Sequence, residues 1–431
     1  MALTAGLVLF IVFILMLAIS VPISVSIVIA SMAAILTVLP WDMAIFTAGQ
    51  KIVTGLDSFT LLAVPFFILS GILMNNGGIA ERLINFAKVL VGKMPGSLAH
   101  TNVLGNMLFG SLSGSSVAAA AAIGGVMGPL QKKEGYDPKF SAAVNIASAP
   151  TGLIIPPSGT LIIYSLVSGG TSVAALFIAG YIPGILWGLA CMVVAYVIAK
   201  RRKYPVSERV SLKVALKTFL DAIPSLLMIV IVIGGILAGV FTATEAAAVA
   251  VAYTFILAIA YRAVKLKDMP RIIMETVEIT AVIMLLVAAS SIMSWVMAFT
   301  GIPTAISNMI MGISDSPIII LLVINIFLLF LGTFMDITPA VLIFTPIFLP
   351  IVMSFGMDPI HFGIMMVMNL SIGNITPPVG SALFVGASIA KLDLEDVVKP
   401  LLPFYAAIII VLLLVTYIPE ISMVLPRLLG Y

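Results

Sequence analysis

Long apolar stretches separated by short polar segments run along the whole chain. The uninterrupted ones lie near residues 3–20, 22–39, 60–76, 173–199, 222–241, 243–262, 278–299 and 400–418. Their lengths suit helices that cross the hydrocarbon core of a bilayer, which takes roughly 17–25 mostly apolar residues. Backbone polar groups in lipid must pair within the protein, and the alternating pattern of barrel strands is absent. The pattern therefore predicts an all-α polytopic membrane protein.

Four further apolar segments are interrupted by glycine, serine or proline. Two of them, at 96–132 and 317–355, are predicted to form hairpins, because their interruptions fall near the middle of the segment. The other two, at 141–168 and 360–387, are each broken by a Pro-Pro pair. Proline lacks a backbone N–H and clashes with the preceding turn, so each pair predicts a break in a helix.

Two sequence motifs recur at one offset of 221 residues. Gly135–Pro138 (GYDP) corresponds to Gly356–Pro359 (GMDP), and Gly152–Gly159 (GLIIPPSG) corresponds to Gly373–Gly380 (GNITPPVG). One matching Pro-Pro pair could arise by chance, whereas two complete motifs at the same offset indicate an internal duplication.

The duplication divides the chain into a first repeat at 1–205, a basic cytoplasmic linker at 206–220 and a second repeat at 221–431. Each repeat contains scaffold helices, one hairpin and one broken helix. If the hairpins are re-entrant, each repeat crosses the membrane an odd number of times, and the second copy is inverted relative to the first. We therefore expect two inverted-topology repeats.

Composition and charge support the membrane assignment and predict an orientation. The chain is 62% hydrophobic and 9% charged, whereas soluble domains carry roughly 25% charged residues. Cytoplasmic loops of membrane proteins are enriched in lysine and arginine. With both termini in the periplasm, all of the 21 basic residues except Lys51 and Arg427 fall on the cytoplasmic side. Counting either hairpin as one full span spoils this asymmetry, so the first hairpin is predicted to enter from the cytoplasm and the second from outside.

Inverted repeats with broken helices predict a binding site near the bilayer midplane. Four segments are expected to converge there: the hairpin tips Gly110–Ser116 and Gly332–Asp336, and the breaks Gly152–Pro157 and Gly373–Pro378. Freed carbonyls and hydroxyls are hard oxygen ligands suited to Na⁺, and the N-termini of half-helices favour an anionic substrate.

Each of these features has a simpler structural explanation. The proline pairs could be kinks, and the serines at 113, 115 and 116 could bond back to their own helix. Asp336 is the only acid in either tip, and an acid at that depth is functional by default, but it could instead serve a backbone N–H. Glu245 is interpreted as a helix N-terminal carboxylate.

Isolated polar and sulfur-containing residues are interpreted as packing residues. His100 and His361 show no metal-ligand spacing, the methionines at 365–368 suit a core, and the single cysteine, Cys191, lies in an apolar stretch. The sequences G-x-x-x-x-G-K-[ST], H-E-x-x-H and G-x-S-x-G are absent. An enzyme is therefore not expected, and transport energy should come from an ion gradient unless a partner supplies an ATPase.

Four stretches together resemble the large membrane (M) subunit of tripartite ATP-independent periplasmic (TRAP) transporters. They are GSLSGSSVAAAAAIGGVMGPLQKKEGYDP from Gly110, GLIIPPS from Gly152, GVFTATEAAAVAVAY from Gly239 and GNITPPVG from Gly373. The resemblance covers nearly the whole chain. The chain departs from it at Ala243, where the family often has proline, at a turn remote from the predicted site.

The resemblance implies an elevator-type, Na⁺-driven importer of small organic acids in the bacterial inner membrane. Two partners are implied: a small four-helix membrane subunit and a periplasmic substrate-binding protein. No nucleic acid is expected as a partner. The substrate stays open among sialic acid, C4-dicarboxylates and other carboxylates.

The resemblance also assigns residues to sites. One sodium site is implied at Gly114, Ser115, Ser116, Gly152, Ile155 and Pro157, and a second at Gly332, Thr333, Asp336, Gly373, Thr376 and Pro378. The substrate-binding candidates are Ser113, Ser115, Pro156, Asn374 and Pro377.

Two rival functions remain at this point. One is a free-standing elevator-type Na⁺/carboxylate carrier that works without a binding protein, which a neighbouring gene for such a protein would exclude. The other is a channel or membrane scaffold without coupled transport, which ion-dependent uptake into vesicles would exclude.

Overall fold

The computed structural model of the chain describes residues 2–76, 78–206, 211–312 and 316–431, and these contain helices and no strand. The elements of the first half are α1 (Ala2–Ala18), α2 (Ile23–Ile35), α3 (Trp41–Leu56), the 3-10 turn η1 (Phe59–Leu62), α4 (Ala63–Asn76), α5 (Ile79–Val91), α6 (Ser97–Ser113), α7 (Ser116–Lys133), α8 (Pro138–Ser148), α9 (Thr151–Ile154), α10 (Gly159–Val167) and α11 (Val173–Arg202).

A similar order follows in the second half. Its elements are α12 (Leu212–Leu237), α13 (Ala243–Ala260), the 3-10 turn η2 (Leu266–Asp268), α14 (Met269–Thr300), α15 (Ile302–Met311), α16 (Pro317–Gly332), α17 (Ile337–Ser354), α18 (Pro359–Gly373), α19 (Ser381–Ala390), α20 (Leu394–Tyr417) and α21 (Glu420–Leu428). Where the first half breaks between α3 and α4, the second half has the single 32-residue helix α14.

The duplicated G-x-D-P motif begins the same element in each half. Gly135 and Gly356 adopt positive φ angles of 79° and 86°, which glycine reaches without a steric penalty. The following aspartate caps the next helix: Asp137 accepts a hydrogen bond from the N–H of Lys139 at 3.0 Å, and Asp358 from that of Ile360 at 2.7 Å. Proline then occupies the first helical position, where its missing N–H costs nothing. The motif is therefore a turn-and-cap signal for α8 and α18.

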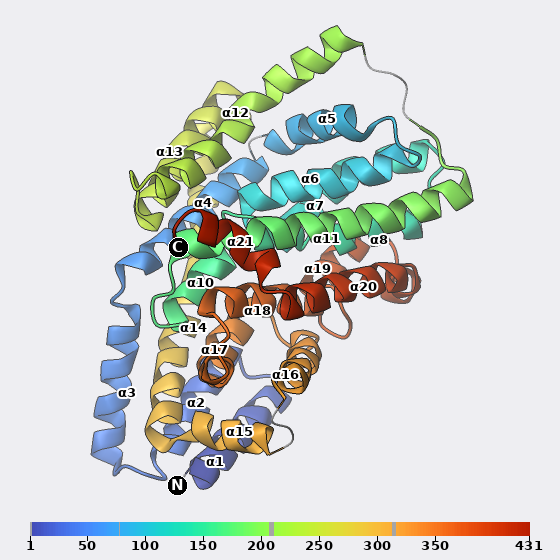
Figure 1. Cartoon of the computed structure of the whole chain (residues 1–431). Helices are drawn as coiled ribbons and strands as arrows, with labels where there is room; N and C mark the ends of the chain where they lie inside the picture. The colour runs from blue at the N-terminus through green and yellow to red at the C-terminus, as the bar shows by residue number, and fades with distance from the viewer. Residues whose placement is uncertain (1, 77, 207–210, 313–315) are drawn as a thin grey trace.

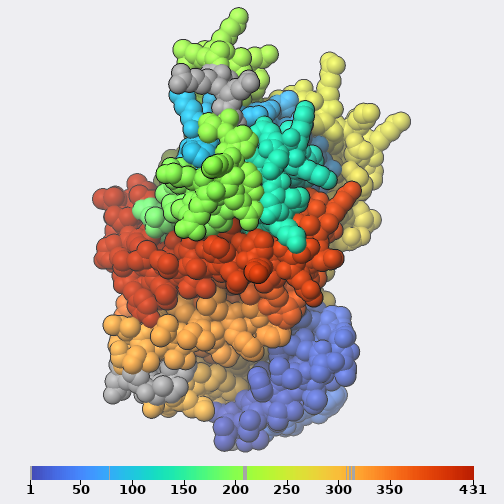
Figure 2. Space-filling view, turned by 90° about the vertical axis from the view of Figure 1, so that its right-hand side faces the viewer, coloured from blue at the N-terminus to red at the C-terminus, as the bar shows by residue number. Residues whose placement is uncertain are grey.

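The helices form a layered bundle (Figure 1). The pairs α1–α2 and α12–α13 lie at opposite ends of the view, and the hairpins and broken helices lie between them. Helices α11 and α20 pack side by side across the centre. The C-terminal residues form a red band across the middle of one face, with green residues above it and orange residues of the second half below (Figure 2).

The predicted apolar segments all form helices, and the structure adds elements that the apolar pattern did not indicate. Helix α12 begins at Leu212, so most of the predicted linker at 206–220 is helical, with residues 207–210 outside the described part of the chain. The apolar pattern also missed the short helices α3, α5, α15 and α21, because each carries apolar residues on one face only.

Within the described ranges, seven helices are long and apolar enough to cross a membrane, or eight if the bent pair Pro138–Ile154 and Gly159–Val167 counts as one span. The two parts of that pair meet at 47°. Helix α17, the second arm of the second predicted hairpin, meets the length criterion by itself. The re-entrant hairpins and the inverted orientation of the second repeat therefore remain predictions, which rest on the distribution of basic residues.

Candidate functional site

The first hairpin turns at Gly114. This residue has a φ of 62°, and its N–H closes α6 by donating to the carbonyl of Gly110 at 2.8 Å. Ser115 then caps α7, accepting a hydrogen bond from the N–H of Ala118 at 3.2 Å. Glycine supplies the left-handed conformation and serine the cap, so the tip is a helix stop followed at once by a helix start.

The second hairpin turns over Thr333–Asp336. The Thr333 hydroxyl donates to the carbonyl of Phe330 at 2.7 Å, and the Thr333 carbonyl accepts from the N–H of Val379 at 3.0 Å. The second bond ties the hairpin tip to the neighbouring break. Asp336 occupies the N-cap position of α17, but that helix has no side-chain capping hydrogen bond.

Both proline pairs separate two helices that the sequence pattern runs together. In the first half, α9 ends at Ile154 and α10 begins after Ser158, whose hydroxyl donates to the carbonyl of Leu153 at 2.6 Å. In the second half, α18 ends at Gly373 and α19 begins at Ser381. The kink-only explanation is therefore wrong in one respect: each pair lies in non-helical backbone and not within a continuous bent helix.

A pair of glycines brings each hairpin against its break. A Cβ added to Gly152 would lie 2.4 Å from the Cα of Gly110, and one added to Gly373 would lie 2.4 Å from the Cα of Gly332. No side chain fits at these crossings, so backbone packs directly on backbone. These glycines shape the site by close packing.

The second part of each broken helix packs against the hairpin of the other half. Helix α10 contacts α17, and α19 contacts α7. A buried hydrogen bond joins the halves as well: the Asn374 side-chain amide donates to the Ser116 hydroxyl at 2.7 Å. The hairpin tips and breaks therefore meet as predicted, as one interlocked centre.

A cavity of about 560 Å³ opens at this centre. Helices α7, α10, α17 and α19 all begin at its wall, with Ser116, Gly159, Ile337 and Ser381 among the lining residues. Helices α4 and α14 form another part of the wall, contributing apolar residues such as Phe67 and Ile283. Among the described residues, the lining includes no lysine or arginine, and the charged residues in it are Asp336 and Glu275.

The cavity reaches some of the predicted site residues and not others. Those that line it are Ser113, Gly114, Ser115, Ser116, Pro157, Asp336 and Asn374. Those outside its lining are Gly152, Ile155, Pro156, Gly332, Thr333, Gly373, Thr376, Pro377 and Pro378. Several of the second group have other contacts: the Thr376 hydroxyl, for example, donates to the carbonyl of Ile372 at 2.7 Å.

The serine hydroxyls of the first tip have different partners. Ser113 donates to the carbonyl of Gly110 at 3.4 Å and Ser115 caps α7, so both make the local bonds of the simpler explanation. Ser116 differs, because its partner is Asn374 of the other half. Asp336 lies at the cavity wall, close to the N–H of Ile337 and 3.4 Å from the Ser381 hydroxyl.

Several lining residues escaped the sequence-based prediction. They are the polar residues Asn75, Thr160, Glu275, Thr338 and Ser381. Ser381 directly follows the duplicated proline motif, and Glu275 lies just before the predicted span at 278–299, so position relative to these features was the available signal. Nothing in the local sequence marks Asn75 as part of the site.

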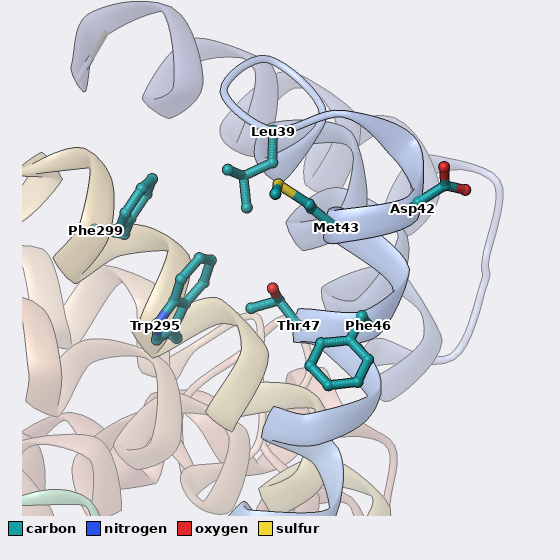
Figure 3. Close-up of a pocket in the computed structure, with 7 residues that line it drawn as sticks. All are labelled: Leu39, Asp42, Met43, Phe46, Thr47, Trp295 and Phe299. Atoms are coloured by element: carbon teal, nitrogen blue, oxygen red, sulfur yellow. The ribbon is translucent and has the colours of Figure 1, made fainter.

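A second hollow of about 500 Å³ lies between α3 and α14 (Figure 3). Its lining is mostly apolar, with Trp295 stacked on Phe299 at 4.8 Å between ring centroids. Asp42 points away from the hollow. Since its lining includes none of the predicted site residues, it does not belong to the candidate site.

The residues interpreted as packing residues do pack. Cys191 and the methionines at 365–368 are buried, and the Nε2 of His361 lies 2.7 Å from the carbonyl of Val415. Glu245 forms a capping box with Thr242 at the start of α13, which confirms its interpretation. In the described part of the chain, no three His, Cys, Asp or Glu side chains form a metal-binding group.

A polytopic helical bundle whose broken helices meet at a central cavity defines a membrane transporter. Residues 10–421 match the family model described as "Tripartite ATP-independent periplasmic transporter, DctM component". The chain belongs to this family of transporter components, which confirms the resemblance seen in the sequence.

Known relatives match over most of their length. The sialic acid TRAP transporter large permease protein SiaM of Vibrio cholerae is 42% identical, over 89% of this chain and 90% of SiaM. The C4-dicarboxylate TRAP transporter large permease protein DctM of Pseudomonas aeruginosa is 43% identical, over 87% and 88%. An uncharacterized Salmonella typhimurium protein, YgiK, is 56% identical over 96% of each chain.

A solved structure shares the fold. The YdaH transporter of Alcanivorax borkumensis, described as having an unusual topology, aligns with a TM-score of 0.60 over 91% of this chain and 90% of that one. At 13% identity this similarity concerns the fold alone.

Proposed function

We propose that this chain is the transport subunit of a Na⁺-coupled importer of small organic acids. The observation that carries the proposal is the central cavity, where four helices begin and where no basic side chain from the described part of the chain lines the wall. Helix N-termini present unpaired N–H groups and a partial positive charge, and both stabilise a bound anion. A carboxylate could thus bind without a lysine or arginine and be released again readily.

The substrate class follows from the cavity and from the relatives. A volume of about 560 Å³ lies within the range of small-molecule sites, roughly 300–1,000 Å³. The relatives are named for sialic acid, C4-dicarboxylate and 2,3-diketo-L-gulonate, all of which are organic acids. A related small carboxylate is proposed as the substrate of this chain.

Sodium is proposed as the coupling ion. The C-terminal ends of α6 and α9 lie at one hairpin and break, and those of α16 and α18 at the other. The last turn of a helix has backbone carbonyls without a partner inside that helix, and Asp336 adds a carboxylate at the second tip. Two sodium sites, one at each hairpin, fit this distribution of oxygen ligands.

The family name implies partners that the chain itself does not contain. A periplasmic binding protein would deliver the substrate, and a small four-helix membrane subunit would pack against this chain in the bacterial inner membrane. Both termini are proposed to face the periplasm. Movement of the hairpins and broken helices against the scaffold, as in an elevator, is the proposed transport step.

Reconstitution tests the proposal and separates it from the free-standing alternative. Proteoliposomes would hold this chain with its co-encoded membrane subunit, and the ligand of the co-encoded binding protein would identify the substrate. Uptake should require an inward Na⁺ gradient and the loaded binding protein. Uptake driven equally well by K⁺ would exclude sodium coupling, and equal uptake without the binding protein would favour a free-standing carrier.

A further inference from the structure

A chain of side chains links the two halves at the cavity wall. It runs from Ser116 in the first hairpin through Asn374 and Ser381 to Asp336 in the second hairpin. Asn374 and Ser116 are 5% and 2% exposed, so their hydrogen bond is held away from solvent. Ser381 and Asp336 lie at the edge of the cavity.

The Asn374 side chain bridges α19 and the first hairpin. Its amide oxygen faces α19, where the N–H of Ala382 lies 3.3 Å from it and 3.2 Å from the Asn374 backbone carbonyl. Its amide nitrogen faces the Ser116 hydroxyl at 2.7 Å, an orientation assigned from the hydrogen-bonding partners on each side. With both ends occupied, Asn374 holds α19 and the first hairpin at a fixed separation.

Ser381 is the branching point of the chain. Its hydroxyl carries one hydrogen and has two acceptors within reach: Asn374 Oδ1, which is nearer, and Asp336 Oδ1 at 3.4 Å. It can satisfy only one of them at a time. A change in what surrounds the Asp336 carboxylate therefore changes the hydrogen bonding of Asn374.

We propose that Ser381 is a positioning residue that couples the two ion sites by sharing its single hydrogen between Asp336 and Asn374. The proposal rests on the proposed function, since it needs cations at both hairpins. A cation beside Asp336 satisfies the carboxylate, so the Ser381 hydrogen stays on Asn374 and the amide keeps Ser116 in place. Without that cation, the carboxylate draws the hydrogen, and Asn374 holds the first tip less firmly.

Coupling of this kind makes the ions bind cooperatively. Occupation of one site favours the other, and the effect is reciprocal. Removal of the Ser381 hydroxyl should separate the two sites while leaving every proposed ion ligand in place. The steepness of the Na⁺ dependence is the quantity that should change, and a purely structural role for Ser381 would not change it.

Sodium titrations of the reconstituted complex test the proposal with Ser381→Ala, Ser381→Thr and the control Ser388→Ala. Ser388 lies on the same helix and is exposed. Wild type and Ser388→Ala should give a Hill coefficient between one and two. Ser381→Ala should still take up substrate with Na⁺, with a Hill coefficient near one and a half-saturating concentration raised several-fold. Ser381→Thr, which keeps the hydroxyl, should restore the steepness.

A second readout does not depend on transport. Thermal unfolding of the purified chain at increasing Na⁺ should show that the Na⁺ dependence of the unfolding temperature is less steep in Ser381→Ala than in the wild type. If the alanine variant does not fold, Ser381→Cys, which keeps the side-chain size, replaces it. If Ser381→Ala and Ser381→Cys both have the Hill coefficient of the wild type, Ser381 does not couple the two ion sites. A Hill coefficient of one in the wild type would also overturn the coupling role. In those cases sodium-dependent uptake would persist, whereas the absence of any Na⁺ dependence would overturn the proposed function itself.

Discussion

Glycine has a steric role at two crossings in the site. Gly110 packs on Gly152 and Gly332 on Gly373, each with backbone against backbone. Such contacts place the backbone of a hairpin beside that of a break, where the proposed sodium sites would require oxygen ligands. The duplicated motif contains Gly152 and Gly373, so the sequence alone identified one glycine of each packed pair. Their partners were recognisable only as members of the hairpin tips.

Gly152→Ala should therefore destabilise the protein and abolish transport. The new Cβ would lie 2.4 Å from the Cα of Gly110, and neither backbone can move without displacing the hairpin. Overpacked cores cost about 1–3 kcal/mol, and a backbone clash belongs at the upper end. Thermal unfolding of the detergent-solubilised protein, together with reconstituted uptake, measures both effects.

Gly125→Ala is the matched control, because a Cβ there would meet nothing within 4 Å. It lies inside helix α7, where alanine is favoured over glycine by about 1 kcal/mol. This variant should unfold at the same or a higher temperature and keep its uptake. Equal destabilisation of both variants would show that the Gly110–Gly152 crossing has no special steric role.

Asp336 and Glu275 are the two acids that the described part of the chain contributes to the cavity lining, and they provide a matched pair. Asp336→Asn should raise the half-saturating Na⁺ concentration about tenfold, which corresponds to about 1.4 kcal/mol of binding free energy. The reason is that a carboxylate at a hairpin tip is a strong ligand for a cation, whereas an amide oxygen carries no charge. Initial uptake rates at increasing Na⁺ provide the measurement.

Glu275→Gln removes the same charge from the part of the wall formed by α14, which belongs to neither hairpin. It should leave the half-saturating Na⁺ concentration within about twofold, a difference of roughly 0.4 kcal/mol. If both variants shift the Na⁺ dependence equally, Asp336 acts through the overall charge of the cavity. If neither does, Asp336 is a structural residue at the start of α17.

At the scale of elements, sequence alone predicted every long apolar helix and both breaks. Those features follow from the free-energy cost of placing polar groups in lipid. The alternation of long apolar stretches and short polar segments in the sequence reflects this cost directly. The amphipathic helices α3, α5, α15 and α21 escaped because their apolar residues are spaced at helical intervals and do not form a run. The sequence also did not indicate that the second half has the single helix α14 where the first half has α3 and α4. A segment that has lost such a break looks like any other apolar stretch.

The predicted inversion can be tested at two equivalent positions. Lys133 ends α7 and Ser354 ends α17, and the two residues stand at the repeat offset of 221. Both are exposed, and Ser354→Cys is nearly isosteric. In a Cys191→Ala background, a membrane-impermeant thiol reagent should label Lys133→Cys only from the cytoplasm and Ser354→Cys only from the periplasm.

Arg202→Cys serves as the control for the cytoplasmic side, because it lies in the basic last turn of α11. Labelling of Lys133→Cys and Ser354→Cys from one side would rule out inverted hairpins and leave α17 as a full span. Ser354 is a better reporter than nearby Gly356, whose φ of 86° disfavours any side chain.

At the scale of the whole molecule, only part of the cavity wall could be predicted from the sequence. Hairpin tips and breaks could be predicted to meet, because repeats with broken helices share a midplane. The remaining wall comes from α4 and α14, which carry no motif and reach the site only through packing. Asn75 of α4 and Glu275 of α14 were therefore missed. Their contribution depends on how the whole chain folds.

The last prediction concerns the stability of the whole chain. A ligand that binds only the folded state stabilises it by RT ln(1 + [L]/Kd), which is about 2.7 kcal/mol at a hundredfold excess over Kd. Each proposed sodium site combines a hairpin tip with a break that lies far from it in the sequence, so an unfolded chain cannot bind there. The purified chain, without partners or substrate, should therefore unfold at a temperature a few degrees higher in Na⁺ than in K⁺ at equal ionic strength. Asp336→Asn should reduce this difference and Glu275→Gln should preserve it. Identical unfolding temperatures in the two salts for the wild type would show that the isolated chain holds no sodium site.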